Sequence, residues 1–489
     1  MMTPAALHRQ ATETIPAGYG RAALAAVMVA LGIYLLTIAP DLTWANASPD
    51  GVELITASAT LGIAHPPGYP TYIVLAKLFS LLPVGTVAFR YNLFSALATS
   101  LTVGLVVLII GFLHARVRPM TAAAAALLFG FAPLVWSQAL VAEIYPLNLL
   151  LLALFLLAWS RNNTSIWVGI WLGLAITTHP TSFFFLPLLL IGGGRRAGRS
   201  MVGILIGLLP LLLLPILAAG DSPIIWGRPT GLAGWWWLVS GQLYGANLRP
   251  DIDWAHSRSL LQALMLGPSL IVTTGNIRLF VARTANDEAA GRRLKIILLG
   301  LAGLLYVGFA FFYRTPDAAV LLLPALLIAA LLIAPILERG GRAALVLPLL
   351  LVVVTFSARD LSDVRDVRPS AEMMLELAPA NALLLTPGDR TIFTILYFQH
   401  VEGRRLDLRV ADANLFAFDW YREQLRSQYP DIFVPEADDL LAFEHNNGQE
   451  RPFCRASLVS RPDASAAPAI TAGDPAFVVP YIDCRQPSP

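Results

Sequence analysis

Long runs of apolar residues dominate the chain from residue 22 to residue 357. We predict eleven membrane helices, because a backbone in lipid must satisfy its own hydrogen bonds and about 20 apolar residues span the hydrocarbon core. They lie near 22–40, 89–112, 120–136, 146–160, 165–179, 181–193, 201–219, 259–280, 294–313, 317–336 and 342–357. The run 165–193 is short for two spans, so His179-Pro180 marks either a kink or a tight hairpin.

The pattern changes after Arg359, where apolar and polar residues mix as they do in soluble folds. Residues 381–386 and 406–411 read as strands, and residues 389–401 and 420–428 read as helices. Strand, helix and strand at this spacing predict a small α/β domain, and no glycine-rich fingerprint accompanies it. The predicted fold is therefore an all-α polytopic bundle over 1–357, followed by a C-terminal α/β domain over 358–489.

Composition supports a membrane protein. Of 489 residues, 56% are hydrophobic and only 13% are charged, whereas soluble proteins carry about 25% charged residues. The net charge of +2, without a basic stripe, argues against a nucleic-acid partner. Residues 1–21 lack a convincing cleavage site, so we expect the first apolar run to stay attached as a helix.

The distribution of Lys and Arg over the short loops predicts the orientation, because the positive side of a membrane protein is cytoplasmic. The loops after alternate spans, together with Arg9 and Arg21, contain Arg116, Arg118, Arg161, Arg195, Arg196, Arg199, Arg283, Arg292, Arg293, Lys295, Arg339 and Arg342. Eleven spans then place loops 41–88, 220–258 and 314–316, and everything after residue 356, on the extracytoplasmic side. Within the first of these loops, residues 71–82 are too short to span and read as an interfacial helix.

Asp50 and Glu53 are the sharpest chemical signal in the outer loops. Their i, i+3 spacing places both carboxylates on one face of a helical turn, and carboxylates this close to a membrane are costly unless wet, paired or functional. Asp50 alternatively only caps the helix that follows it. We favour a catalytic or ligand-binding role for the pair.

Further candidates share this outer face. Glu143, followed by Tyr145, lies where the third span ends, and His65 and His179 suit acid–base or phosphate contacts, although each also fits plain packing or solvation. Arg228 and Arg314, together with Arg249, suit a phosphate, but each alone also fits a snorkelling interface residue.

Aromatic residues gather in the loop 220–258, among them Trp226 and Tyr244. Such rings favour the headgroup level, so one interpretation is an ordinary aromatic belt. The other is a platform for a lipid-linked or sugar ligand.

Together these groups suit glycosyl transfer from a lipid-phosphate sugar. A carboxylate base would take the proton of the acceptor hydroxyl, and positive groups would stabilise the departing phosphate. The only cysteines, Cys454 and Cys484, lie in the terminal domain and offer no zinc motif. We expect them to form a disulfide rather than two free thiols, and the segment 455–483 between them, rich in Ala, Pro and Ser, to order poorly.

The segment 48–70, which contains Asp50, Glu53 and His-Pro-Pro-Gly-Tyr-Pro, resembles the signature of the protein O-mannosyltransferase-like family of multi-pass membrane proteins. Residues 136–145, residues 226–230 with 235–244, and Thr386-Pro-Gly-Asp389 running to residue 403 agree with the same family. The resemblance covers roughly residues 20–412. One departure is that family members often have Gly-Asp-Ser-Gly-Glu where this chain has Ser-Pro-Asp-Gly-Val-Glu at 48–53.

This resemblance implies a GT-C type fold with its active site on the non-cytoplasmic face and a polyprenyl-phosphate sugar as donor. It places the base at Asp50 or Glu53 and matches Glu143 to the family's Ala-Glu-x-Tyr position. The expected reaction moves a sugar, mannose favoured, to a protein or lipid hydroxyl with inversion. No metal ligand or cofactor is predicted, and a need for a divalent cation stays open.

The alternative from another class is a transporter or flippase of a lipid-linked or small polar solute, although no internal repeat supports it. A non-catalytic scaffold would leave the carboxylates unexplained.

Overall fold

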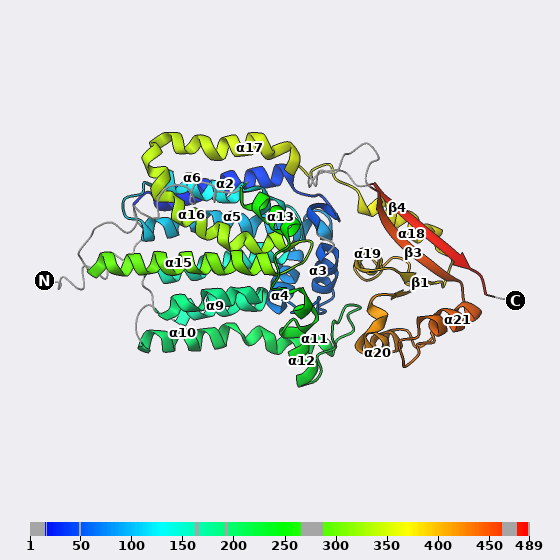
Figure 1. Cartoon of the computed structure of the whole chain (residues 1–489). Helices are drawn as coiled ribbons and strands as arrows, with labels where there is room; N and C mark the ends of the chain where they lie inside the picture. The colour runs from blue at the N-terminus through cyan, green and yellow to red at the C-terminus, as the bar shows by residue number, and fades with distance from the viewer. Residues whose placement is uncertain are drawn as a thin grey trace.

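A computed structural model describes Ile15 and residues 17–47, 50–161, 166–190, 194–265, 287–461 and 477–487. Helices form the chain up to Arg359, and the four strands of the described residues all follow Leu377. Figure 1 shows the long helices side by side as one bundle, with the sheet beyond one end of it. The division into two domains at residue 357 stays a prediction.

Helical segments occupy all eleven predicted ranges, although residues 266–280 of the eighth lie outside the described residues. Within the described part, five helices are long and apolar enough to cross a membrane, or six if the bent pair α6–α7 is one span. The number of spans therefore stays a prediction. The segments are α2 (Tyr19–Thr37), α5 (Val87–Leu113), α6 (Pro119–Gly130), α7 (Pro133–Ala139), α8 (Ile144–Ser160), α9 (Ile166–Thr178), η2 (Pro180–Leu190), α10 (Gly194–Gly207), η3 (Leu209–Leu213), α11 (Leu214–Ala218), α13 (Trp254–Met265), α15 (Asp287–Phe312), η6 (Ala318–Leu322), α16 (Leu323–Leu337), η7 (Glu338–Leu345) and α17 (Val346–Arg359).

Helices α9 and α10 run in the same direction, which explains the short run 165–193. Gly169 meets Gly203, and Gly173 meets Gly207, so closely that a Cβ at any of the four would collide with the opposite backbone. This close approach is the usual benefit of small residues at helix interfaces in membranes. Because the pairing runs in parallel, the chain must return along the bundle between the two helices, and η2 lies in this return segment. His179-Pro180 is therefore a reversal of direction.

Short elements crowd the end of the bundle that faces the sheet (Figure 1). They include α3 (Asp50–Ala59), α4 (Pro70–Ser80), α12 (Leu232–Val239) and η4 (Gln242–Asn247), of which α4 matches the short helix predicted at 71–82. A parallel bridge between Ile63 and Ile225 ties the loop after α3 to the loop before α12. Two loops that are far apart in the sequence therefore share one local framework.

The C-terminal strands form one mixed sheet in the order β2-β1-β3-β4. Its strands are β1 (Leu383–Thr386), β2 (Arg409–Asp412), β3 (Phe453–Arg461) and β4 (Phe477–Arg485), with β1 parallel to β2 and β3, and β4 antiparallel to β3. The helices are α18 (Val367–Leu377), α19 (Asp389–His400), α20 (Asp419–Gln428) and α21 (Leu440–Glu450). The predicted strand–helix–strand unit and the helix at 420–428 are confirmed.

The prediction of poor order after Cys454 is wrong at both ends of that segment. Residues up to Arg461 form β3, and residues from Phe477 form β4, with Cys454 opposite Cys484 in the ladder. The expected disulfide between these two cysteines is confirmed. The pairing partner supplies the hydrogen bonds that the local composition does not suggest, and residues 462–476 lie outside the described residues.

Candidate active site

The first turn of α3 holds the two predicted carboxylates in different environments. The Glu53 side chain is 1% exposed, whereas the Asp50 side chain is 38% exposed. The predicted single helical turn is therefore present, but only Asp50 is open to a ligand.

His65 connects this turn to the loop that follows α3. Its Nδ1 donates to Glu53 Oε2 at 2.6 Å, and its backbone N–H donates to Glu53 Oε1 at 2.8 Å. Its Nε2 lies 2.9 Å from the hydroxyl of Tyr69 and 3.9 Å from Asp50 Oδ2. Glu53 is thus fully engaged in holding His65, and the imidazole lies between the buried and the accessible carboxylate.

The loop reaches this arrangement through a left-handed backbone at Gly68 and Tyr69, with φ of 88° and 46°. Leu214 and Leu238 press so close to Gly68 that a Cβ there would lie 3.1 Å from each. Glycine is the residue that tolerates both the conformation and the crowding. The Gly in His-Pro-Pro-Gly-Tyr-Pro therefore lets Tyr69 fold back onto His65.

Electrostatics reinforce the cluster. Burial alone would lower the pKa of His65, but the Glu53 and Asp50 carboxylates outweigh it and raise this pKa to about 10. Burial also raises the pKa of Asp50, with the positive His65 opposing and Glu53 adding to the rise. At neutral pH the site therefore holds an imidazolium beside an Asp50 carboxyl that binds a proton more readily than an ordinary aspartate.

An aromatic wall surrounds His65. The ring centroids of Tyr69, Tyr244 and Trp226 lie 5.1, 6.3 and 6.4 Å from that of His65, each at a steep angle. The structure thus brings the two predicted aromatic residues, Trp226 and Tyr244, to the acidic cluster. A belt at the headgroup level would not need this convergence.

Glu143, Tyr145 and His179 gather at the neighbouring helix ends. Glu143 is buried just before α8, and the rings of Tyr145 and His179 lie 5.6 Å apart. Tyr145 interacts electrostatically with Asp50, and His179 with His65. His179 Nδ1 also lies 2.7 Å from Thr181 Oγ1. Tyr145 and His179 therefore lie within electrostatic range of the cluster, and Glu143 lies close enough to Tyr145 to interact with it.

The predicted arginines are placed less directly. Arg314 Nη2 donates at 2.7 Å to both the side chain and the backbone carbonyl of Asp251. Arg228 is half-buried, follows Gly227 in the left-handed region with φ of 36°, and lies two residues after Trp226. Among the described residues neither guanidinium makes an ion pair with Asp50 or Glu53.

Asp389 is a site residue that sequence reasoning did not single out, although it ends the family-like Thr386-Pro-Gly-Asp389. It begins α19, which packs against α3. The residue is exposed, yet partial burial of its carboxyl and the charges of Glu53, Asp412 and Asp50 raise its pKa to about 7. The C-terminal region therefore adds a third carboxyl group near the cluster.

A cation could be held by Asp50, Glu53 and His65, whose nearest ligand atoms all lie within 4.8 Å of one another. In the described geometry Glu53 and His65 satisfy each other instead, and a metal would have to displace this hydrogen bond.

Comparisons with known proteins agree with the fold and with the region of the site. Models described as "Protein O-mannosyl-transferase TMEM260 N-terminal domain" and "TMEM260-associated domain 2" match residues 50–192 and 367–433. The chain is similar to the Protein O-mannosyl-transferase TMEM260 of Mus musculus, with 25% identity over 79% of this chain and 62% of the relative. It is also similar to that of Dictyostelium discoideum, with 23% identity over 86% of this chain and 61% of the relative. The chain thus spans about three fifths of the length of these relatives.

A solved structure, ArnT from Cupriavidus metallidurans bound to undecaprenyl phosphate, has a similar fold. The TM-score is 0.54 with 14% identity, and the match covers 90% of this chain and 92% of ArnT. The chain therefore shares its overall fold with ArnT. Both domain models and both relatives are described as protein O-mannosyl-transferases or parts of them, so the chain is similar to that family over these residues.

Proposed function

We propose that this chain transfers a sugar, mannose favoured, from a polyprenyl-phosphate donor to a hydroxyl of a protein or lipid acceptor. The observation that carries the proposal is the difference between two neighbouring carboxylates. Glu53 is buried and bound to His65, whereas Asp50 is accessible beside them. A general base must be held in place and must be open to the hydroxyl whose proton it takes, and Asp50 meets both conditions.

In the proposed reaction Asp50 takes the proton of the acceptor hydroxyl. The hydroxyl oxygen bonds to the anomeric carbon while the bond from that carbon to the phosphate oxygen breaks, and the phosphate leaves with the electron pair. A single displacement of this kind inverts the anomeric centre. The raised pKa of Asp50 suits a base that must accept a proton near neutral pH.

Glu53, His65 and Tyr69 act as positioning residues in this scheme. The imidazolium between Glu53 and Asp50 offsets their negative charges and fixes the orientation of the α3 turn. Trp226 and Tyr244 offer ring faces to the sugar, and Glu143, Tyr145 and His179 lie near the cluster, where donor or acceptor groups bind. Arg228 contributes positive charge to the phosphate, whereas Arg314 would first have to exchange its Asp251 partner.

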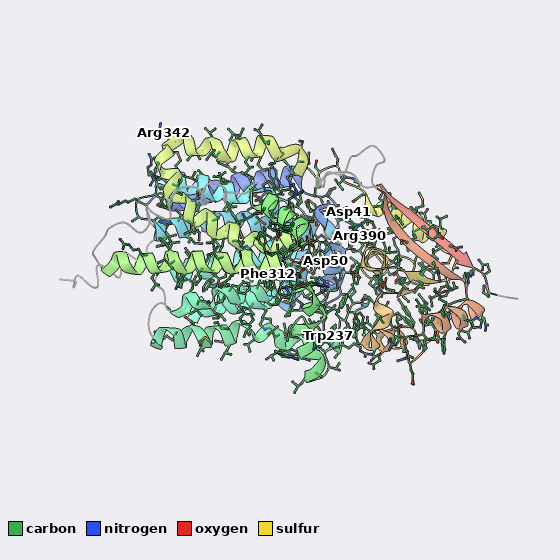
Figure 2. All side chains as sticks on the ribbon, viewed as in Figure 1. Asp41, Asp50, Trp237, Phe312, Arg342 and Arg390 are labelled. Atoms are coloured by element: carbon green, nitrogen blue, oxygen red, sulfur yellow. A yellow bond between two sulfur atoms is a disulfide. The ribbon has the colours of Figure 1, made fainter. Side chains whose placement is uncertain are left out.

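Two observations support a lipid-linked donor and an extracytoplasmic site. ArnT, the fold neighbour, is bound to undecaprenyl phosphate. Figure 2 shows Asp50 at the end of the bundle facing the sheet and Arg342, from a predicted cytoplasmic loop, at the other end. With the basic loops inside, the site and the C-terminal region would face outward in a multi-pass protein of the cell membrane.

The direct test is reconstitution of the full chain with polyprenyl-phosphate mannose, glucose or arabinose, each with protein and lipid acceptors. Transfer of labelled sugar to a hydroxyl, with one donor preferred, is the expected result. Movement of the intact labelled lipid across the bilayer without a new glycosidic bond would overturn the proposal in favour of a flippase. Absence of transfer with every donor and acceptor class would overturn it as well.

A further inference from the structure

Helix α19 connects the C-terminal sheet to the first outer loop. Its first residue, Asp389, starts a helix that packs against α3, the helix of Asp50 and Glu53. The next residue, Arg390, places its guanidinium carbon 5.4 Å from the centre of the Trp44 ring in the same outer loop. Figure 2 shows Asp50 and Arg390 at the junction of the bundle and the sheet.

The turn that presents Asp389 is built rigidly. Thr386 Oγ1 donates to Asp412 Oδ2 at 2.6 Å, and Asn414 Nδ2 donates to the Pro387 carbonyl at 2.9 Å. Gly388 has φ of 144°, and a Cβ there would come within 3.0 Å of Asn414 Nδ2. The carboxyl of Asp389 itself makes no hydrogen bond or ion pair within the part of the chain that the structure describes, so it is available to a ligand.

The other end of α19 is fastened to the bundle by a partly buried clamp around Arg368. The guanidinium binds Glu402, just after α19, at 2.6 and 3.0 Å, and it also binds Asp41, just after α2. Its carbon lies 5.1 Å from the ring centre of Phe398 in α19. A two-pronged pair of this kind fixes geometry as well as charge. Both ends of α19 are therefore fixed relative to the first outer loop.

We propose that Asp389 completes the active site and binds the acceptor, with Arg368 as its positioning residue. This inference rests on the proposed function and names which substrate the C-terminal region contacts. A polyprenyl donor would reach Asp50 from the membrane around the bundle, so the acceptor hydroxyl would approach from the end of the bundle, beyond which the sheet lies (Figure 1). A carboxylate there accepts a hydrogen bond from a hydroxyl and aims its oxygen toward the sugar.

The raised pKa of Asp389 predicts that acceptor binding depends on pH near neutrality. With a pKa of about 7, the carboxyl becomes the ionised acceptor of a hydrogen bond as the pH rises from about 6 to 8. The apparent affinity for the acceptor should improve over the same range.

The test compares Asp389→Asn and Asp389→Glu with Asp438→Asn, which changes an exposed carboxylate elsewhere in the C-terminal region. The reconstituted wild type defines the acceptor KM, the donor KM and the pH profile. We expect Asp389→Asn to raise the acceptor KM at least about 10-fold and to keep the donor KM within about twofold. The change of the acceptor KM with pH near pH 7 should also become smaller in this variant. Equal KM values in Asp389→Asn, Asp389→Glu and the control would overturn the inference while the wild-type activity upheld the proposed function. An inactive wild type would instead overturn the proposed function.

The clamp is tested by a cycle of Arg368→Met, Asp389→Asn and the double variant. If Arg368 acts through Asp389, the double variant raises the acceptor KM no further than Asp389→Asn alone. Additive effects would show that Arg368 acts elsewhere and would overturn its assignment as a positioning residue for Asp389.

Discussion

Glu53 binds His65 twice, through the ring Nδ1 at 2.6 Å and through the backbone N–H at 2.8 Å. A carboxylate with both oxygens occupied in a buried position has little freedom to take a proton from a substrate. Asp50, one turn earlier, faces the same imidazole at 3.9 Å and is accessible. This relationship separates the roles of two carboxylates that look equivalent along the chain.

Asp50→Asn tests the assignment of the base. We expect it to lower turnover at least about 100-fold, because the amide cannot accept the proton of the acceptor hydroxyl. Donor binding should survive, as measured by donor KM or direct binding, and Asp438→Asn serves as the control. An active Asp50→Asn variant beside an inactive Glu53→Gln variant would exchange the two roles. Activity in both variants would remove the basis of the proposed mechanism.

The Glu53–His65 pair predicts a pH-dependent stability. The pKa of His65 is raised from its usual 6.5 to about 10. The contribution of the charged pair to the free energy of unfolding is therefore complete below about pH 6.5 and is lost as the pH rises toward 10. The slope from one such group is at most about 1.4 kcal/mol per pH unit.

Melting temperatures in detergent from pH 6.5 to 9.5 would measure this loss. The wild type should lose stability more steeply than His65→Asn, which has no titrating ring, and Glu53→Gln should lie between them. Identical slopes in the wild type and His65→Asn would contradict the prediction.

The orientation is checked by fusions to alkaline phosphatase, which is active only outside the cytoplasm. The bias of Lys and Arg predicts an active fusion at the C-terminus and an inactive one near Arg196. The parallel packing of α9 and α10 makes the second site informative, because the first turn of α10, which contains Arg196, lies at the same bundle end as the first turn of α9. The reverse pattern would put the site on the cytoplasmic face.

The Cys454–Cys484 disulfide should stabilise the sheet region. It closes a loop with a sequence separation of 30, which corresponds to roughly 3–4 kcal/mol in the chain-entropy model. Cys454→Ser with Cys484→Ser should therefore lower the melting temperature of this region. Intact-mass analysis of the unreduced, alkylated wild type should show no added alkyl groups, and two added groups would refute the bridge.

Local pattern was enough for much of the fold. Apolar runs predict the helices because a membrane helix satisfies its backbone within itself, whatever its neighbours are. The strand ending at Thr386 and the helix starting at Asp389 follow in the same way from short-range periodicity. The pairing of Cys454 with Cys484 follows from there being only two cysteines. By contrast, β3 and β4 were missed because a strand depends on a partner that local composition does not reveal.

The sequence by itself determined which chemical groups the chain offers: the acidic pair at 50 and 53, the histidine at 65, and the aromatic loop with Trp226 and Tyr244. Only the tertiary structure decided which carboxylate is open, that Trp226 and Tyr244 meet at His65, and that Asp389 comes from the other end of the chain to join them. The physical reason is that a residue's type and its near neighbours are local properties. Burial, hydrogen-bond partners and electrostatic environment depend instead on how distant segments pack, and they decide which of several similar groups can react.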